Sequence, residues 1–562
     1  MKWWGWAVFV VLLGALLRLS MLDLRPMHTD EAVHAVKFGT LLETGVYRYD
    51  RHEYHGPTLN YFTLLPAWTV GEETLAELSE GTLRIVPALC GIGVVLLILS
   101  LRSAGPTAVA AAALIAACSP ILTYYSRYYI QETLLVFFTM GLIVSAFRFL
   151  ATGRAGWAAA AGISAGLMFA TKETWIISIG AMGVSLLATR MIQRRGGVAS
   201  PWKGTGPGRL RSAALGAAAG LAVSVLFFSS FFTNWEGVRD SILAYQTYVG
   251  RAGEDSRHGN PWYYFLRMLV WWHEAPGPIW TQASIVIFSA AGILGSFFRP
   301  AVGSRSSSPG AGIRRSSFEA AGDAAPPFRA AGGIGARLEG PGAAQPARDL
   351  RIFLGTYACL MLISISVLPY KTPWLILGAL LPLIIMAGWG VADFLAWLPA
   401  RMRVPGYLLL AILGAHLAWQ SYLANFECYD SPSNPMVYAH PTDDVRQIAQ
   451  IVEDAASAVR GDLPVQVVVS GDEYWPLPWY LRRVSHVGWW GAVTNDFTPT
   501  PVILVSPDVE QDLIARLYES PPPGDRPLYV PLFERPMFLR PGREIRGYVT
   551  LELSNRLRQA KG

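Results

Sequence analysis

Charged residues and cysteines are both scarce in this chain. Only 15% of its 562 residues are charged, whereas 52% are hydrophobic, and the mean hydropathy is +0.32. A soluble domain needs more charge than this to cover its water-facing surface, so the composition excludes an ordinary soluble protein. Cys90, Cys118 and Cys359 fall in apolar stretches and only Cys428 does not, so we expect no framework of disulfide bonds.

Several short motifs are missing as well. The polar carboxy-terminal region has no GxGxxG or Walker A pattern and no metal-finger spacing, so the sequence gives no support to nucleotide binding there. The net charge of +6, from 46 Lys and Arg against 40 Asp and Glu, is explained mostly by membrane topology. We therefore expect no nucleic acid among the partners.

Long apolar stretches are what the chain has instead. A helix needs roughly 20 apolar residues to cross a bilayer, and eleven stretches approach that length. They lie at residues 4–21, 82–101, 106–122, 133–150, 157–171, 174–189, 212–232, 279–298, 352–368, 373–398 and 406–423. An aromatic stretch at 262–272 is divided by Arg267 and is expected at the membrane surface. The sequence therefore predicts an all-α polytopic membrane protein with about 11 transmembrane helices.

Charge asymmetry predicts the orientation of these helices, because Lys and Arg are retained on the cytoplasmic side of short loops. The stretch 190–211 holds six basic residues and no acid, whereas residues 23–81 hold ten acids and four bases. The first apolar segment has no small-residue cleavage site before Arg18 and is expected to be a retained anchor. We expect a plasma (inner) membrane protein with a cytoplasmic amino terminus and residues 23–81 outside.

Composition also divides the chain into parts. Residues 1–298 form the expected main membrane block, 299–350 a disordered cytoplasmic linker rich in Gly, Ala, Ser, Pro and Arg, and 351–424 the last helices. Residues 425–562 are polar, with a helical pattern at 442–459 and β-rich runs at 465–469 and 502–505. Alternating helices and strands predict a small extracytoplasmic α/β domain there.

The first outer loop carries two polar segments. Asp30 and Glu31 lie just beyond the first span, where adjacent carboxylates suit acid/base work or, alternatively, cap an interfacial helix. His55 lies in a second segment, His-Gly-Pro-Thr. The four histidines of this loop could bind a divalent metal, but none of the usual ligand spacings is present and no cofactor is certain.

Three further outer ends combine aromatic residues with a cation, in the segments 124–132, 171–175 and 369–374. Taken singly, each segment is explained by the usual enrichment of Tyr, Trp, Lys and Arg at membrane interfaces. Taken together, they place Arg127, Lys172 and Lys371 at the membrane level of the acidic residues. That combination suits transfer from an anionic lipid phosphate, with the cations on the phosphate and a carboxylate on the acceptor's proton.

The order of these motifs resembles the GT-C membrane glycosyltransferases. Within them it is similar to protein O-mannosyltransferases, aminoarabinose transferases and the group labelled flippase-activity-associated proteins. Asp30-Glu31 matches their acidic motif, and Ala170-Thr171-Lys172 their Thr-Lys step. His55–Leu59 is similar to their His-Pro-Pro-Leu segment, Ser126–Glu132 to their Ser-Arg-Tyr motif, and Tyr370–Trp374 to their basic aromatic segment. The resemblance covers roughly residues 1–400 and leaves out the carboxy-terminal domain.

This resemblance implies an inverting transfer of a sugar from a polyprenyl-phosphate donor to an acceptor hydroxyl on the outer face. The acceptor would be a glycan, a lipid or a protein. Asp30 would be the general base, with Glu31 and Glu132 positioning the substrate or Asp30 itself. Glu132 stands where the family usually has Asp, so its side chain is longer than the pattern expects.

The same resemblance implies the substrate-binding residues. Arg127, Lys172 and Lys371 would neutralise the departing phosphate, and His55 and Tyr370 come from matched segments at the substrate. Two other readings remain open. One is a flippase or transporter of lipid-linked glycans, and the other is a non-catalytic accessory or receptor protein that acts through its outer domain.

Overall fold

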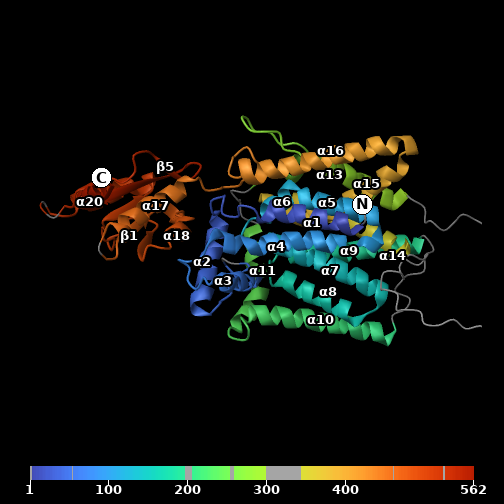
Figure 1. Ribbon diagram of the computed structural model, residues 1–562. Helices are drawn as coiled ribbons and strands as arrows, with labels where there is room; N and C mark the ends of the chain where they lie inside the picture. The colour runs from blue at the N-terminus through green and yellow to red at the C-terminus, as the bar shows by residue number, and fades with distance from the viewer. Residues whose placement is uncertain are drawn as a thin grey trace, which may run out of the picture.

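The protein consists of a long helical bundle with a small α/β domain at one end (Figure 1). The computed structural model describes residues 3–52, 55–195, 206–252, 259–298, 344–459, 461–522, 524 and 526–561. Within these ranges, seven helices are long and apolar enough to cross a membrane, and four shorter apolar helices accompany them. Each of the eleven predicted stretches overlaps one of these helices, so the predicted fold class is confirmed.

The helices of the bundle run along its length. They are α1 (Trp3–Leu19), α4 (Glu80–Leu99), α5 (Pro106–Cys118), α6 (Pro120–Tyr125), α7 (Glu132–Thr152), α8 (Ala155–Phe169), α9 (Trp175–Arg195), α10 (Pro207–Phe228), α13 (Ala283–Phe298), α14 (Ala344–Val367), α15 (Leu377–Trp397) and α16 (Arg403–Tyr422). Four further helices are α2 (Thr29–Thr44), α3 (Thr58–Val70), α11 (Glu236–Ala252) and α12 (Tyr264–Val270). Of these, α2, α3 and α11 lie toward the end of the bundle that carries the α/β domain, which we call the outer domain because it lies beyond that end (Figure 1).

Two of the sequence predictions differ from these bounds. The stretch 106–122 forms two helices, because the Ser119 side chain caps α6 and Pro120 begins it. The predicted linker 299–350 lies outside the described residues as far as position 343. Its last residues, 344–350, begin α14.

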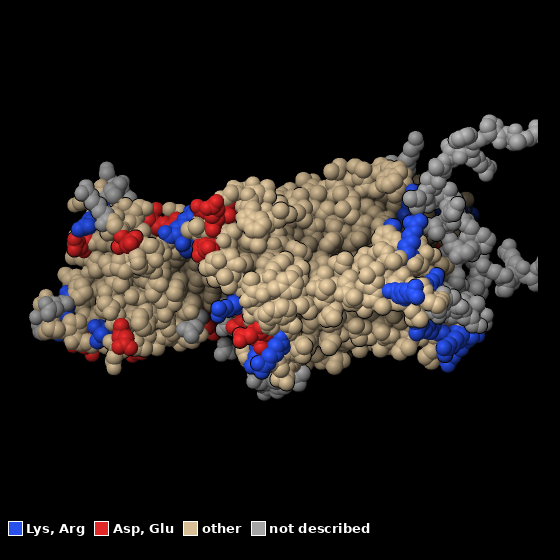
Figure 2. Space-filling view, turned by 90° about the horizontal axis from the view of Figure 1, so that it is seen from below, with Lys and Arg blue, Asp and Glu red and all other residues tan. Residues whose placement is uncertain are grey.

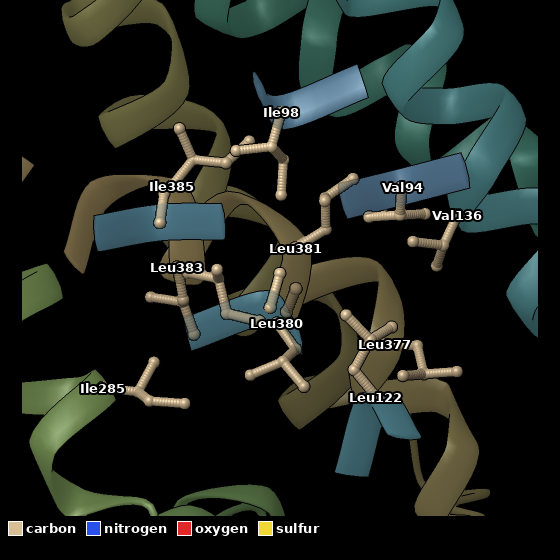
Figure 3. Packing of buried hydrophobic residues seen from close by; sticks show 14 of the residues in the cluster. Val94, Ile98, Leu122, Val136, Ile285, Leu377, Leu380, Leu381, Leu383 and Ile385 are labelled. Atoms are coloured by element: carbon tan, nitrogen blue, oxygen red, sulfur yellow. The ribbon is translucent and has the colours of Figure 1, made fainter. Parts of the chain in front are cut away.

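The core of the bundle is built around α15. Figure 3 shows Leu380, Leu381 and Ile385 of this helix among aliphatic side chains from α4 and its neighbours, including Val94 and Ile98. All five side chains are buried. A helix that is apolar on every side is stable at the centre of a bundle, where no face meets water.

Close packing of α8 against α10 depends on glycine. A Cβ on Gly162 would lie 1.7 Å from the carbonyl oxygen of Gly216, and a Cβ on Gly220 would lie 2.6 Å from that of Gly162. Small residues four positions apart allow helix backbones to approach closely in a membrane, where apolar burial alone gives no attraction between helices.

The outer domain is a mixed sheet with helices. Its strands are β1 (Pro464–Val468), β2 (His486–Trp490), β3 (Val502–Val505), β4 (Tyr529–Pro531), β5 (Met537–Arg540) and β6 (Arg543–Thr550). Its helices are α17 (Asp444–Ser457), α18 (Leu477–Tyr480), α19 (Pro507–Ile514) and α20 (Leu551–Lys561). The sheet order is β2-β1-β3-β6-β4, with β5 paired to β6. β2, β1 and β3 are parallel, and β6 is antiparallel to β3.

Polar contacts join this domain to the bundle. The Met27 amide donates to the Tyr480 hydroxyl at 2.7 Å, and that hydroxyl lies 3.2 Å from the Glu80 carboxylate at the start of α4. Arg446 of α17 donates to the same carboxylate at 3.0 Å. The loop before α2 is therefore enclosed between α4 and the outer domain.

Candidate active site

The amino end of α2 presents Asp30 to solvent. The His28 ring accepts a hydrogen bond from the Asp30 amide at 3.1 Å, and Glu31 accepts one from the His28 amide at 3.0 Å, which together form a capping box. The Asp30 side chain is 46% exposed, and one carboxylate oxygen lies 4.0 Å from the His28 ring. A rigid helix end thus holds this carboxylate at the surface.

Glu31, the next residue, has the opposite environment. It is fully buried and accepts two hydrogen bonds from Arg84 of α4, at 2.8 and 2.9 Å, and one from the Tyr129 amide at 2.7 Å. The Arg84 and Arg25 guanidinium groups outweigh the cost of burial and lower the pKa of Glu31 to about 2. Glu31 therefore fixes α2 against α4 and the 126–131 segment, which is a positioning role.

A buried ion pair lies beside α2. Glu132, at the start of α7, pairs with Lys172 from the turn between α8 and α9. The second carboxylate oxygen of Glu132 is buried and has no hydrogen-bond partner among the described residues. The preceding residue, Gln131, lies 3.4 Å from the ring of His34 on α2. This pair is therefore close to α2 and retains an acceptor for a substrate hydroxyl.

His34 connects these groups. Its pKa is lowered to about 3, mainly by burial and also by the charges of His55 and Lys172, which together outweigh the opposing charges of Asp30 and Glu31. Its ring centre lies 6.1 Å from that of His55. The predicted residues Asp30, Glu31, Lys172 and His55 therefore share one electrostatic neighbourhood.

His55 is held by a carboxylate that the sequence analysis did not select. Its Nδ1 lies 2.8 Å from Glu173, which also accepts from the Tyr49 hydroxyl at 3.1 Å. The charge of His55 and the hydrogen bond to it outweigh burial and lower the pKa of Glu173 to about 2. Glu173 directly follows Lys172, so one turn supplies both a cation and the partner of the histidine.

The His-Gly-Pro-Thr segment packs directly on this turn. The hydroxyls of Thr58 and Thr171 lie 2.8 Å apart, and the Thr58 amide donates to the Ala170 carbonyl at 3.3 Å. A Cβ on Gly56 would lie 2.1 Å from the same carbonyl oxygen. Glycine is therefore required at position 56, where two backbones meet.

Three predicted residues lie elsewhere. The Arg127 guanidinium donates to carbonyls at the end of α1, including Leu17 at 3.2 Å and Met21 at 2.8 Å. Lys371 is buried and donates to the carbonyls of Asn260, at 3.0 Å, and Leu368. Tyr370 is 45% exposed on the same segment. Backbone carbonyls thus accept hydrogen bonds from both Arg127 and Lys371, and the role of these two cations at the phosphate stays a prediction.

A second cluster, around His28, was not predicted. The Nε2 of His28 lies 2.9 Å from the Tyr438 carbonyl, and its ring packs near Trp374, Tyr128 and His440, with centroid separations of 5.8, 5.6 and 6.1 Å. Since Nδ1 accepts from the Asp30 amide, Nε2 carries the proton that is donated to Tyr438. His28 thereby connects α2 to the segment that leads into the outer domain.

One sequence signal could have identified part of this network. Arg84 lies inside a predicted span, and a charge at such a position is rare unless a partner neutralises it. Glu31 had already been selected as a motif residue, so its ion pair with Arg84 could have been predicted from the sequence. No three His, Cys, Asp or Glu residues gather as a metal site in the described part of the chain.

Known proteins share this architecture. The family model for dolichyl-phosphate-mannose-protein mannosyltransferase matches residues 65–205, and no curated protein matches the chain. ArnT from Cupriavidus metallidurans in the apo state is similar over 97% of this chain and 98% of its own, at 16% identity and a TM-score of 0.58. The same protein bound to undecaprenyl phosphate gives the same values.

A third solved structure, the arabinofuranosyltransferase AftD from Mycobacteria, is similar over 97% of this chain and 39% of its own, at 14% identity and a TM-score of 0.48. The similarity to ArnT establishes the fold of the whole chain. The family-model match over residues 65–205 and the ArnT-like fold both agree with the resemblance to GT-C membrane glycosyltransferases that the order of the motifs predicted.

Proposed function

We propose that the protein transfers a sugar from a polyprenyl-phosphate donor to an acceptor hydroxyl at the outer membrane surface. The observation that carries this proposal is an exposed carboxylate at the start of α2 with a buried ion pair close to the same helix. Asp30 is exposed and rigidly held, whereas the ion pair of Glu132 and Lys172 is buried nearby. The similarity to ArnT, which has been solved with undecaprenyl phosphate, supports a polyprenyl-phosphate donor.

In this mechanism the Asp30 carboxylate accepts the proton of the acceptor hydroxyl. The hydroxyl oxygen attacks the anomeric carbon from the face opposite the phosphate, and the bond between that carbon and the phosphate oxygen breaks. The bonding electron pair leaves with the phosphate, which gives polyprenyl phosphate and an inverted glycosidic bond. Glu31 acts through α2 by holding its first turn against Arg84.

The Lys172 ammonium is the cation best placed for the departing phosphate. An ammonium group has three donors, and the pairing with Glu132 uses one of them. The remaining two can meet phosphate oxygens as their charge grows during bond cleavage. The free oxygen of Glu132 and the ring of His55 would bind sugar hydroxyls.

We further propose that the outer domain faces away from the cytoplasm, in the plasma membrane. Figure 2 shows Lys and Arg without Asp or Glu at the visible face of the bundle end remote from the outer domain, whereas acidic and basic side chains lie together at the junction and on the domain. Basic residues are retained on the cytoplasmic side. The candidate site then lies at the outer surface, between the bundle and an extracytoplasmic domain of residues 425–562.

The test replaces Asp30 by Asn in the purified full chain in proteoliposomes that contain a radiolabelled polyprenyl-phosphate sugar and an acceptor extract. We expect transfer to fall by about 10²- to 10⁴-fold, because positioned base catalysis contributes that much. Asp23→Asn, at an exposed acid of the same loop, is the control and should leave transfer unchanged. Transfer by the Asp30→Asn protein at the normal rate, or movement of intact lipid-linked sugar between leaflets without transfer, would contradict the proposal.

A further inference from the structure

Three aromatic side chains form a cluster on the outer domain. Tyr474 and Trp489 lie with ring centres 4.9 Å apart and planes 37° apart, and Trp475 lies 6.3 Å from Tyr474 at 33°. All three are half-buried and pack on one side against the hydrophobic core of the domain. We call this set the aromatic platform. It differs from the neighbouring Trp479, which is fully buried.

The platform lies at the edge of the sheet where ligands usually bind. β1 and β2 are parallel, and Val467 on β1 is paired with Trp489 on β2. Trp489 is next to the last residue of β2, and Tyr474 and Trp475 belong to the loop that leaves the carboxyl end of β1. In α/β sheets, ligands bind in the crevice outside the carboxyl ends of the parallel strands.

Charged groups lie beside the aromatic rings. Glu473, adjacent to Tyr474, accepts a hydrogen bond from Arg540 at 2.8 Å and forms an ion pair with Arg543 at 2.6 Å. Arg543 is 42% exposed, and Glu473 and Arg540 are each at least 20% exposed. These side chains provide both donors and acceptors next to an apolar face. This combination is typical of sites that bind small polar molecules by their shape and hydroxyl groups.

The same residues lie toward the candidate active site. Burial is the main cause that lowers the pKa of His28, the cap of α2, and the charge of Arg540 makes a smaller contribution in the same direction. Six residues after Tyr474, Tyr480 of α18 accepts a hydrogen bond from the Met27 amide just before α2. The segment that carries Tyr474 and Trp475 therefore leads directly to the contact with the chain that precedes Asp30.

From this arrangement we propose that the aromatic platform and its charged neighbours bind a saccharide portion of the acceptor. The inference rests on the proposed transferase function and assigns the acceptor to the glycans. Pyranose rings present flat C–H faces that stack on aromatic side chains, and their hydroxyls would exchange hydrogen bonds with Glu473, Arg540 and Arg543. A lipid surface fits less well, because the rings lie beside a carboxylate and two guanidinium groups.

Direct binding tests the proposal without catalysis. The full chain in lipid nanodiscs is titrated with fluorescein-labelled mannohexaose, maltohexaose and an arabinan hexamer, and fluorescence anisotropy is recorded. We expect saturable binding of at least one oligosaccharide and an affinity about tenfold lower in the Trp489→Ala variant, as expected when one stacking ring is lost. Trp489→Phe should retain most of the affinity because it keeps an aromatic face.

Trp490→Phe is the matched control, because Trp490 points to the opposite face of β2, where it packs against Phe497 with a centroid distance of 5.7 Å. Its affinity should equal that of the unchanged protein. If no oligosaccharide binds saturably, or if Trp489→Ala binds as tightly as the control, the platform is not a saccharide site. Binding only to labelled vesicles of anionic lipid would overturn the proposal in favour of membrane contact.

The two proposals fail in different ways. If oligosaccharide binding depends on Trp489 but Asp30→Asn transfers sugar normally, the saccharide site stands and the proposed chemistry falls. If Asp30→Asn loses transfer while no oligosaccharide binds, the chemistry stands and the acceptor belongs to another class.

Discussion

Neighbouring carboxylates acquire different roles from their surroundings. Asp30 and Glu31 are adjacent in sequence, yet one faces solvent and the other is fully buried against a guanidinium group. The pKa of Glu31 is lowered to about 2, so it stays ionised and bound to Arg84 at physiological pH. A carboxylate in such a pair holds structure, and only its exposed neighbour has room to approach an acceptor.

Replacing Glu31 by Gln should therefore cost stability first. The change removes the nearest counter-charge of the buried Arg84, which keeps only Glu80 at 3.5 Å, and breaking a buried ion pair typically costs about 3 to 5 kcal/mol. We expect a markedly lower midpoint of thermal unfolding at pH 7, measured by differential scanning fluorimetry in detergent. Glu552→Gln, which removes an exposed pair with Arg556, should unfold like the unchanged protein.

The same variant has a defined pH dependence. Because the pKa of Glu31 is lower in the folded protein than the usual 4.5, its stabilisation is complete above pH 4.5 and is lost as the pH falls toward 2. The difference between the unchanged protein and Glu31→Gln should therefore shrink below pH 4.5. A difference that stays constant down to pH 3 would show that the ion pair is not its cause.

Sequence reasoning reached the acidic motif and gave Asp30 and Glu31 different roles, but it did not find the buried ion pair of Glu31 with Arg84. Asp30, Glu31, Glu132, Lys172 and His55 were all selected, and the structure brings their segments together. Arg127 was assigned to a phosphate together with Lys172 and Lys371, as one of three cations at the membrane level of the acids, and its hydrogen bonds to carbonyls at the end of α1 were not predicted. Hydrogen bonds to backbone carbonyls from a distant helix leave no trace in residue spacing.

At the scale of elements, apolar length was an adequate guide to where helices occur, but not to where they break. The span expected at 106–122 is interrupted at Ser119 and Pro120, which have the side chains that cap and begin a new helix. The stretch 157–171, weakened by its small residues, is nevertheless the helix α8. Its glycines are the reason, because they allow α10 to lie directly against it.

The contact between α8 and α10 gives a test at this scale. Gly162→Leu would place side-chain atoms where the Gly216 carbonyl lies, so the helices must separate. We expect a lower thermal unfolding midpoint and a loss of folded protein on size-exclusion chromatography. Gly183→Leu on α9 is the control, since a Cβ there meets nothing within 4 Å, and it should behave normally. Equal stability of the two variants would show that α8 and α10 do not need close contact.

At the scale of the whole molecule, the proposed orientation assigns opposite ends of the bundle to opposite sides of the membrane. Cysteine labelling tests it in a variant whose four native cysteines are replaced by serine. Ser457→Cys on α17 should react with a membrane-impermeant maleimide added to intact cells, whereas Arg401→Cys, between α15 and α16, should react only after lysis. Both side chains are exposed. Labelling of position 401 in intact cells would reverse the orientation.

The contact between His28 and Tyr438 also limits how the chain can be recombined. The His28 ring, which caps α2, donates its N–H proton to the Tyr438 carbonyl. This carbonyl lies in the segment between α16, which ends at Tyr422, and the helices of the outer domain. A chimaera in which all residues after α16 come from a relative would also replace the segment that carries the Tyr438 carbonyl, and with it the partner of His28. Grafts intended to alter acceptor choice should therefore begin after His440 and leave the native connection intact.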